Sequence, residues 1–142
     1  MNVSTRFTVA LHILTLLAST PGEPLTSEFI AGSVNTNPVV IRRLLALLRN
    51  TGFVQSRPGA SGGWEISRDP AKINLADIRR AVNEGSAFAM HNNPPNPACP
   101  VGRNIQGALE GIYTSAERAM EADLARTTIK DLLHQVSARR KT

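Results

Sequence analysis

The chain contains only one cysteine, Cys99, and this excludes an intramolecular disulfide. A single thiol suits a reducing compartment, although an intermolecular disulfide stays open. Runs of eighteen apolar residues are also absent, so no membrane-spanning helix is predicted. The stretch "FTVALHILTLLAS" after Arg6 resembles a secretory signal, but polar residues recur along it at helical spacing, which favours a packed amphipathic helix. We therefore expect a cytoplasmic protein with no membrane partner.

Sequence signatures of enzymes are missing as well. The chain has no phosphate-binding loop, no H-E-x-x-H pair, no nucleophile elbow and no paired cysteines at zinc spacing. The glycine-rich "GASGG" lacks the Lys-Ser/Thr of a nucleotide-binding loop. Cys99 with His91 is the one conceivable nucleophilic pair. We expect a protein that is not an enzyme and has no metal site.

Acidic side chains are absent from residues 29–64. That window holds four arginines, Arg42, Arg43, Arg49 and Arg57. The whole chain has a formal net charge of +5, whereas residues 81–142 are nearly balanced, with seven basic and six acidic side chains. The first half therefore concentrates the positive potential, which favours a polyanionic partner.

Apolar periodicity and capping residues predict a mainly α-helical fold. Residues 7–18 repeat apolar side chains at helical spacing. Thr26 is a suitable N-cap for a short second helix, and Asn37 with Pro38 marks the start of a third helix that ends before Gly52. The expected inward face of the third helix is Ile41, Leu44, Leu45 and Leu48. Two short helices joined by three or four residues match the spacing of a helix-turn-helix.

A small β-hairpin is predicted directly after the third helix. "FVQSR" and "GGWEIS" have strand composition and are joined by "PGAS", which is rich in turn residues. A hairpin in this place is a wing, with Trp64 expected to pack at its base. A fourth helix follows, with an inward face of Leu75, Ile78, Ala81 and Val82 that should pack on the first three helices.

The outer face of the third helix and the wing supply the candidate DNA contacts. They are Thr36, Asn37, Val39, Val40, Arg42, Arg43, Arg57, Ser61, Gly62 and Gly63. Arg43 can bond guanine as a fork, the valines can touch thymine methyl groups, and the two residues before the helix can hold phosphates. Arg57 can enter a narrow minor groove, and the wing glycines let the backbone approach phosphate. The alternative is that both arginines are solvated surface residues on an ordinary hairpin.

Residues 85–100 contain four prolines and three asparagines and predict a loop. From Val101 onward, apolar residues follow alternating steps of four and three, a narrow seam typical of a helix that lies along another helix. The seam, our candidate dimer interface, is Ile105, Leu109, Ile112, Ala116 and Ala119. Thr128 and Asp131 are spaced like a capping box at the start of a last helix.

The run "TNPVVIRRLLALLRNTGFVQSRPGASGGWEISRDPAKINLADIRRAV" resembles the winged helix-turn-helix of the Rrf-two (Rrf2) family, the bacterial regulators related to IscR, NsrR and CymR. The resemblance extends over essentially the whole chain, from the amphipathic first helix to the long helix after Cys99. It implies a transcriptional regulator that binds double-stranded DNA as a homodimer. The dimer would be joined by the helix of residues 101–122 and present two recognition helices to a palindromic operator.

The chain departs from the cluster-binding members of that family. Those members carry three cysteines between the fourth helix and the dimerisation helix, where this chain has Cys99 alone. His12, at a helix position from which some members donate a ligand, and His91 in the loop make a rudimentary site conceivable. A cluster needs several thiolates or compensating histidines, so we expect no iron–sulfur cluster and no other cofactor.

Cys99 should lie at the N-cap of the long helix because Pro100 occupies its first position. There the helix dipole and free N–H groups favour a thiolate, and Arg103 adds positive charge. Such a thiol can oxidise to sulfenic acid or form a mixed or intersubunit disulfide, so redox or electrophile sensing is one hypothesis. The alternative is a small residue that fills an N-cap at low exposure. We expect Cys99 to lie where the DNA-binding body meets the dimerisation helix. Modification of the thiol at that junction would shift the spacing of the two recognition helices.

Three segments are therefore expected: a DNA-binding domain over residues 1–84, a loop with Cys99 over 85–100, and the dimerisation and C-terminal helices over 101–142. The expected function is sequence-specific transcriptional regulation, as a repressor that responds to oxidants or electrophiles. A winged-helix protein-interaction module and an iron–sulfur-dependent regulator are the alternatives. The effector, the operator and the target genes stay open.

Overall fold

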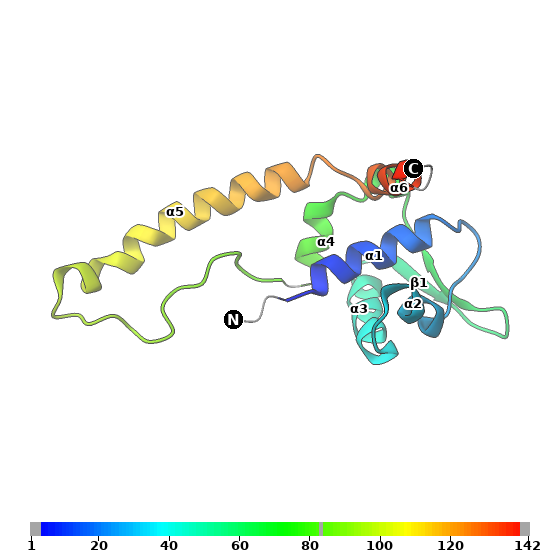
Figure 1. Ribbon diagram of the computed structural model, residues 1–142, viewed down its shortest axis with the longest axis horizontal. Coiled ribbons are helices and arrows are strands. Elements are labelled where there is room, and N and C mark those ends of the chain that lie inside the picture. Colours follow the sequence, from blue (N-terminus) through cyan, green and yellow to red (C-terminus); the bar gives the residue numbers. More distant parts are fainter. Residues whose placement is uncertain (1–3, 83, 140–142) are drawn as a thin grey trace.

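Six α-helices, a short 3-10 helix and a two-stranded hairpin make up the part of the chain that the computed structural model describes, residues 4–82 and 84–139 (Figure 1). In chain order the elements are α1 (Arg6–Ala18), α2 (Ser27–Val34), α3 (Pro38–Asn50), β1 (Val54–Arg57), β2 (Gly63–Ile66), η1 (Pro70–Lys72), α4 (Leu75–Ala81), α5 (Pro100–Leu124) and α6 (Ile129–Arg139). The predicted fold class, mainly α with a small β-hairpin, is confirmed.

Side-chain caps define both helices of the helix-turn-helix. The Thr26 hydroxyl accepts a hydrogen bond from the backbone N–H of Phe29 at 3.1 Å at the start of α2. The Asn37 side chain accepts one from the backbone N–H of Val39 at 2.8 Å at the start of α3. Between them, Asn35 ends α2 in the left-handed conformation (φ 62°), which asparagine adopts more readily than most residues. The turn predicted from these capping residues is therefore present.

The core is built around α1, which contacts α2, α3, α4, α6 and β2. Ile13 and Leu14 of α1 are fully buried. The predicted inward faces of α3 and α4 are buried as well: Ile41, Leu44, Leu45, Leu48, Leu75, Ile78, Ala81 and Val82. The amphipathic first helix is thus a central packing element of the body. No helix among the described residues is long and apolar enough to cross a membrane.

The hairpin packs onto the body through a third backbone segment. β1 and β2 pair antiparallel, with Val54 opposite Ile66 and Arg57 opposite Gly63. Leu25, in the loop before α2, exchanges two backbone hydrogen bonds with Trp64 at 2.9 and 2.7 Å. The Trp64 ring is partly buried against the core, as predicted for a residue at the base of a wing. This bridge fixes where the wing leaves the body.

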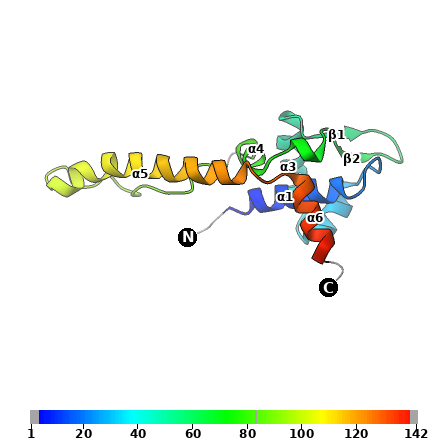
Figure 2. The same cartoon turned by 90° about the horizontal axis from the view of Figure 1, so that it is seen from above.

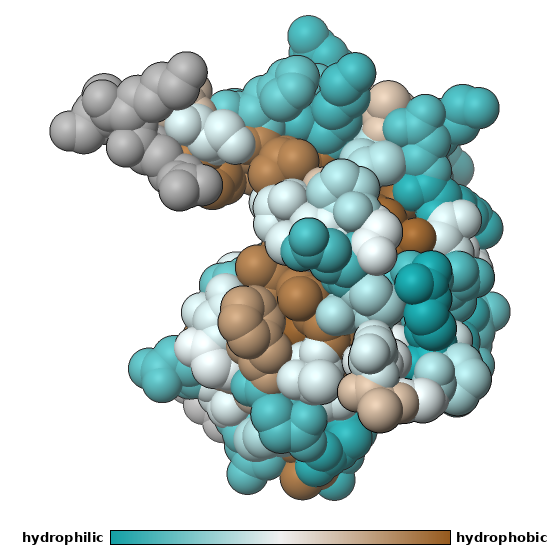
Figure 3. Space-filling model, turned by 90° about the vertical axis from the view of Figure 1, so that its right-hand side faces the viewer, coloured by the Kyte–Doolittle hydropathy of each residue, from teal (hydrophilic) through white to brown (hydrophobic). Residues whose placement is uncertain are grey.

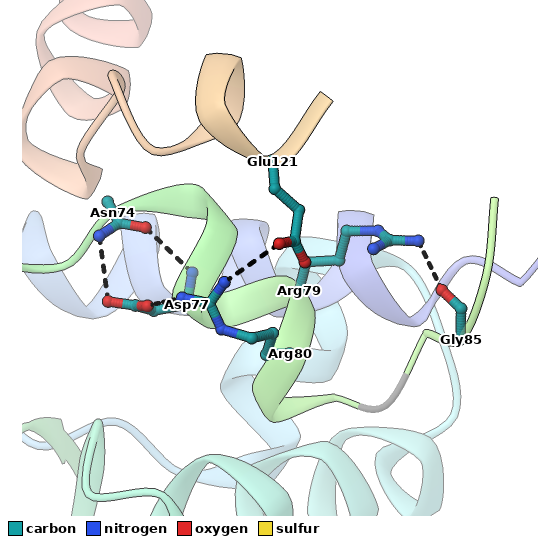
Figure 4. Close-up of polar contacts among 6 residues, drawn as sticks. All are labelled: Asn74, Asp77, Arg79, Arg80, Gly85 and Glu121. Carbon is teal, nitrogen blue, oxygen red and sulfur yellow. Dashed lines mark hydrogen bonds and ion pairs between the residues drawn. The ribbon is translucent and has the colours of Figure 1, made fainter. Parts of the chain in front are cut away.

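Helix α5 projects from the body as a long rod (Figures 1 and 2). Its C-terminal end meets α4, where Arg80 pairs with Asp77 of its own helix and with Glu121 of α5 at 3.6 Å (Figure 4). The Arg79 guanidinium donates to the backbone carbonyl of Gly85 at 2.6 Å. The polypeptide then leaves the body, and α5 begins at the far end of the rod.

Residues 85–99, which we call the strap, run outward from the body beside α5, in the direction opposite to that helix (Figures 1 and 2). The Ala87 N–H donates to the Glu117 carboxylate at 2.6 Å, and the Ser86 hydroxyl donates to the same group. These two donors, Ser86 first, lower the pKa of Glu117. The Phe88 and Tyr113 rings stack with centroids 4.7 Å apart. The predicted loop is thus attached to one flank of the helix.

Helix α6 returns the chain to the body. The predicted capping box is present, because the Thr128 N–H donates to Asp131 at 2.9 Å and the Asp131 N–H donates to the Thr128 hydroxyl at 3.1 Å. Ile129 is fully buried in the core, and its N–H donates to the carbonyl of Ile73 at 2.9 Å. The segment that follows α5 is therefore part of the body.

Candidate nucleic-acid interface

The N-terminal half of α3 presents an exposed basic and apolar surface. Val39 and Val40 are 44% and 39% exposed, large fractions for branched apolar side chains. Arg42 and Arg43 are exposed beside them. Of the two residues before the helix, Asn37 is exposed and Thr36 is half-buried. The outward face derived from helical periodicity therefore matches the exposed face, and its two valines lie outside the buried core.

Residues 29–64 contain no acidic side chain, but the two glutamates that flank this segment each pair with an arginine inside it. Glu28 on α2 contacts Arg42 at 3.3 Å, and both side chains are largely exposed, so this pair adds little stability. Glu65 on β2 contacts Arg57 at 3.0 Å. For Arg43, no ion pair is recorded with any residue that the structure describes. In the N-terminal half of α3, Arg43 is therefore the arginine without a carboxylate partner among the described residues, whereas Arg49, in the last turn, lies over the Trp64 ring at 5.9 Å.

Glu65 organises the polar face of the wing. Its side chain is only 13% exposed, and it accepts hydrogen bonds from Arg57 at 3.2 Å and from Gln55, its cross-strand partner, at 2.8 Å. A guanidinium held by a carboxylate loses less rotamer freedom when it binds a second anion. Glu65 thus positions Arg57 on the wing. The sequence pattern missed this role because only the strand register places the residues side by side.

Two wing glycines are required by contacts within the protein. A Cβ atom on Gly62 would overlap the backbone carbonyl of Arg57, across the turn. A Cβ atom on Gly63 would lie 2.6 Å from the carbonyl oxygen of Leu25, in the bridge to the body. Ser61, at the tip, is exposed. The glycines therefore shape the hairpin, and close approach to phosphate remains a prediction for them.

Replacing Gly62 by alanine is expected to distort the wing, because the added methyl group must displace the Arg57 backbone. We expect the free energy of unfolding to fall by about 1–3 kcal/mol, the usual cost of overpacking. Urea unfolding followed by circular dichroism measures it. Gly32→Ala is the matched control: open space surrounds Gly32 inside α2, so this variant should gain about 0.5–1 kcal/mol. Equal stability of Gly62→Ala and the wild type would contradict the overlap.

Cys99 occupies the predicted N-cap position of α5 but lies far from the predicted junction with the body. It is the N-cap residue and it is exposed, so the alternative of a capping residue at low exposure is wrong. The start of α5 lies at the end of the rod, away from the body (Figure 1). The hypothesis that Cys99 lies where body and dimerisation helix meet is therefore wrong as well, because the strap carries the chain outward before α5 begins. The backbone N–H groups of Gly102 and Val101 lower the pKa of the thiol.

The predicted seam on α5 is only partly covered. Ile105, Leu109 and Ala116 are half-buried, whereas Ala119 is exposed and Ile112 is 62% exposed. The strap lies against the neighbouring flank, at Tyr113 and Glu117. No residue of α5 is buried, although the helix spans 25 residues. The apolar stripe from Ile105 to Ala119 therefore remains partly open to solvent along the rod.

Comparison with known proteins identifies relatives over nearly the whole chain. The sequence model of the Rrf2 protein family, described as "Iron-dependent Transcriptional regulator", matches residues 3–135. YwnA of Bacillus subtilis (strain 168), named as an HTH-type transcriptional regulator, is 44% identical over 135 residues, covering 94% of this chain and 98% of YwnA. The HTH-type transcriptional regulator CymR of the same organism is 31% identical, covering 93% and 89%. A crystal structure described as a DNA-binding protein matches with a TM-score of 0.72 and 42% identity, over 90% of this chain and 98% of the other.

The relatives are transcriptional regulators and not enzymes, as expected for this chain. The family description implies iron, but the donor set does not fit an iron site. The chain has a single thiol, and iron–sulfur ligation requires several thiolates or compensating histidines. Among the described residues, no three His, Cys, Asp or Glu side chains gather where they could hold a metal. His12 instead bonds the Ser33 hydroxyl at 2.9 Å.

Proposed function

The chain belongs to the Rrf2 family of DNA-binding transcriptional regulators, and on this premise we propose that it is a homodimeric repressor of a palindromic operator, responsive to oxidants or electrophiles through Cys99. The observation that carries the proposal is the exposed face of α3, which presents Val39, Val40 and Arg43 to solvent and has no acidic residue in the same helix. Such a face suits the major groove, where arginine reads guanine and valine contacts thymine methyl groups.

A second copy of the chain would cover the open α5 stripe and would give the operator a two-fold symmetry. A second α5 packed along the stripe would cover the exposed Ile112 and the half-buried seam residues beside it. A two-fold dimer presents two α3 helices to half-sites one helical turn apart, which is why the operator should be palindromic. Binding that covers a promoter would repress it.

Selection from a random-sequence DNA library tests this function, because the method requires no candidate operator. We expect the recovered sites to be two-fold symmetric, with half-sites about 10 base pairs apart and affinity of about 10⁻⁸ M or tighter. The affinity should fall steeply with salt, because phosphate contacts release counterions. Placing the recovered site across a reporter promoter should lower its output when the protein is present. Recovery of unrelated sequences would favour the alternative of a protein-interaction module.

The reactivity of Cys99 should extend to lower pH than that of free cysteine. Its pKa is lowered by the Gly102 and Val101 amides, so the thiolate, which is the reactive form, persists below the usual titration range. Alkylation rates measured from pH 5 to pH 10 should give a midpoint below about 8.5, the ordinary value for cysteine. A midpoint at or above that value would exclude an activated thiol. Operator binding of wild type and Cys99→Ser, each with and without diamide, tests sensing: only the wild type should respond.

A further inference from the structure

A pocket of about 550 Å³ opens between α1, α2 and α6, away from the α3 face and the wing. Figure 3 shows a hollow at the left of the molecule, with apolar surface gathered inside it. Its volume is within the range of about 300–1,000 Å³ typical of small-molecule sites. The polar stripe of α1 forms one wall: Thr8, His12, Thr15 and Ser19 all line the pocket. The proposed DNA contacts leave this stripe without a role.

The lining of the pocket defines the kind of molecule that it can accept. Its apolar side chains are Leu11, Leu16, Leu132, Leu133 and Val136, and among residues 4–82 and 84–139 no Lys, Arg, Asp or Glu lines it. A charged ligand would enter this environment without a counter-charge, which is unfavourable. The pocket therefore suits an uncharged and mainly apolar molecule.

One pair of hydrogen-bonding side chains connects two walls of the pocket, and Thr8 and Ser137 add hydroxyl groups elsewhere in the lining. The Thr15 hydroxyl donates to the Leu11 carbonyl at 2.7 Å, and the Ser19 hydroxyl donates to the Leu16 carbonyl at 2.6 Å, so both use their proton within α1. The His12 Nε2 and the Ser33 hydroxyl, 2.9 Å apart, join α1 to α2. An imidazole and a hydroxyl can both donate and accept, so they can fix one polar group of a ligand.

We propose that this pocket binds a small, uncharged, mainly apolar molecule with one hydrogen-bonding group, and that its occupancy regulates DNA binding. The second half of the proposal rests on the proposed function. The pocket joins two elements that matter for it: Ser33 lies near the end of α2, just before the turn into α3, and the α6 wall directly follows α5. A ligand that fits one spacing of α6 and α2 better than another shifts the population of the α3 orientations that accompany them.

A pair of fluorescent probes tests binding in the absence of DNA. N-phenyl-naphthylamine is uncharged with one N–H group, and anilinonaphthalene sulfonate has the same aromatic skeleton with a negative charge. We expect the neutral probe to bind the full-length protein saturably at one site per chain, and the anion to bind at least about 10-fold more weakly. Absence of saturable binding by the neutral probe would overturn the proposal.

Pocket-filling variants locate the site. Ser137→Trp on α6 and Ser33→Phe on α2 fill the pocket from opposite walls, and each should weaken binding of the neutral probe at least about 10-fold. Gln135→Trp is the control, because Gln135 is an exposed α6 residue outside the lining. Unchanged affinity in both filling variants would overturn the proposal. So would a change of oligomeric state in Ser137→Trp, measured by light scattering, since the groove would then be an interface between two copies.

Operator affinity with and without the neutral probe tests the regulatory half. A shift of at least about 5-fold is expected in the wild type and in Gln135→Trp, and none in Ser137→Trp. No shift in the wild type at saturating probe would overturn regulation through the pocket. If instead no DNA sequence is selected at all, the proposed function fails while the probe titrations still decide the binding site.

Discussion

Replacing Arg43 and Arg57 together by alanine is expected to lower operator affinity by at least about 100-fold. Arg43 is the exposed basic side chain at the centre of the α3 face, without a recorded ion pair among the described residues. A forked arginine contact to guanine contributes about 1–3 kcal/mol of discrimination, and each dimer would lose two such contacts. The loss of Arg57 would also leave the Glu65 carboxylate, whose side chain is 13% exposed, without a cationic partner on the proposed DNA-binding face of the wing, with Gln55 as its remaining donor.

The single variants separate the roles of these arginines. Arg43→Ala should relax selectivity at one base position of each half-site, because a base contact is lost. If the wing contacts phosphate, the operator affinity of Arg57→Ala should depend less steeply on salt concentration. If Arg57 enters the minor groove, this variant should instead lose its preference for A·T-rich sequence beside the half-sites. Fluorescence anisotropy on the selected operator at several salt concentrations measures all three variants.

A charge-matched control distinguishes local contacts from net charge. Arg126→Ala with Lys130→Ala removes the same two positive charges from an exposed region after α5. Operator affinity in this control should change by less than about 3-fold, because exposed charges more than a Debye length away are screened. Retention of wild-type affinity by the Arg43/Arg57 double variant would disprove the α3 and wing interface.

Replacing Ile112 by glutamate is expected to separate the proposed dimer and, with it, to abolish tight operator binding. Ile112 is 62% exposed on the open stripe of α5, where a second copy would bury it. A carboxylate there would be desolvated without a partner, so the dimer dissociation constant should rise by about 100-fold or more. Light scattering and sedimentation over a range of concentrations measure the change.

Thr114→Glu is the matched control for this substitution. Thr114 is two residues away on α5 but about 200° around the helix, on the side opposite Ile112, and it is exposed. The added charge is the same, so this variant should remain dimeric and bind the operator normally. A dimer that tolerates glutamate at both positions would show that the α5 stripe is not the interface between subunits.

Local sequence patterns predicted most of the DNA-binding body. Thr26 and Asn37 predicted where α2 and α3 begin, because a capping side chain bonds to backbone groups two or three residues away. The inward faces of α3 and α4 followed from helical periodicity, and the hairpin from strand composition around a Gly-rich turn. Thr128 and Asp131 predicted the start of α6 for the same local reason.

Tertiary contacts determined features that local sequence patterns do not encode, including the path of the loop and the position of Cys99. Composition predicted a loop over residues 85–100, but its outward path depends on contacts with Glu117, about thirty positions away from Ser86 and Ala87. Because the strap runs outward, Cys99 lies at the far end of α5 and not at the expected junction with the body. Likewise, the strand register places Glu65 beside Arg57. The packing of α6 against α1 makes the polar stripe of α1 one wall of a pocket.

The sequence by itself thus determined the secondary structure, the helix-turn-helix with its wing, and the family, because each is encoded by neighbouring residues or by a pattern along the chain. Only the tertiary structure decided which charges are paired, where the single thiol lies and where a cavity opens. These features join residues that are distant in sequence, and their positions depend on how the elements pack and not on the preference of any one segment.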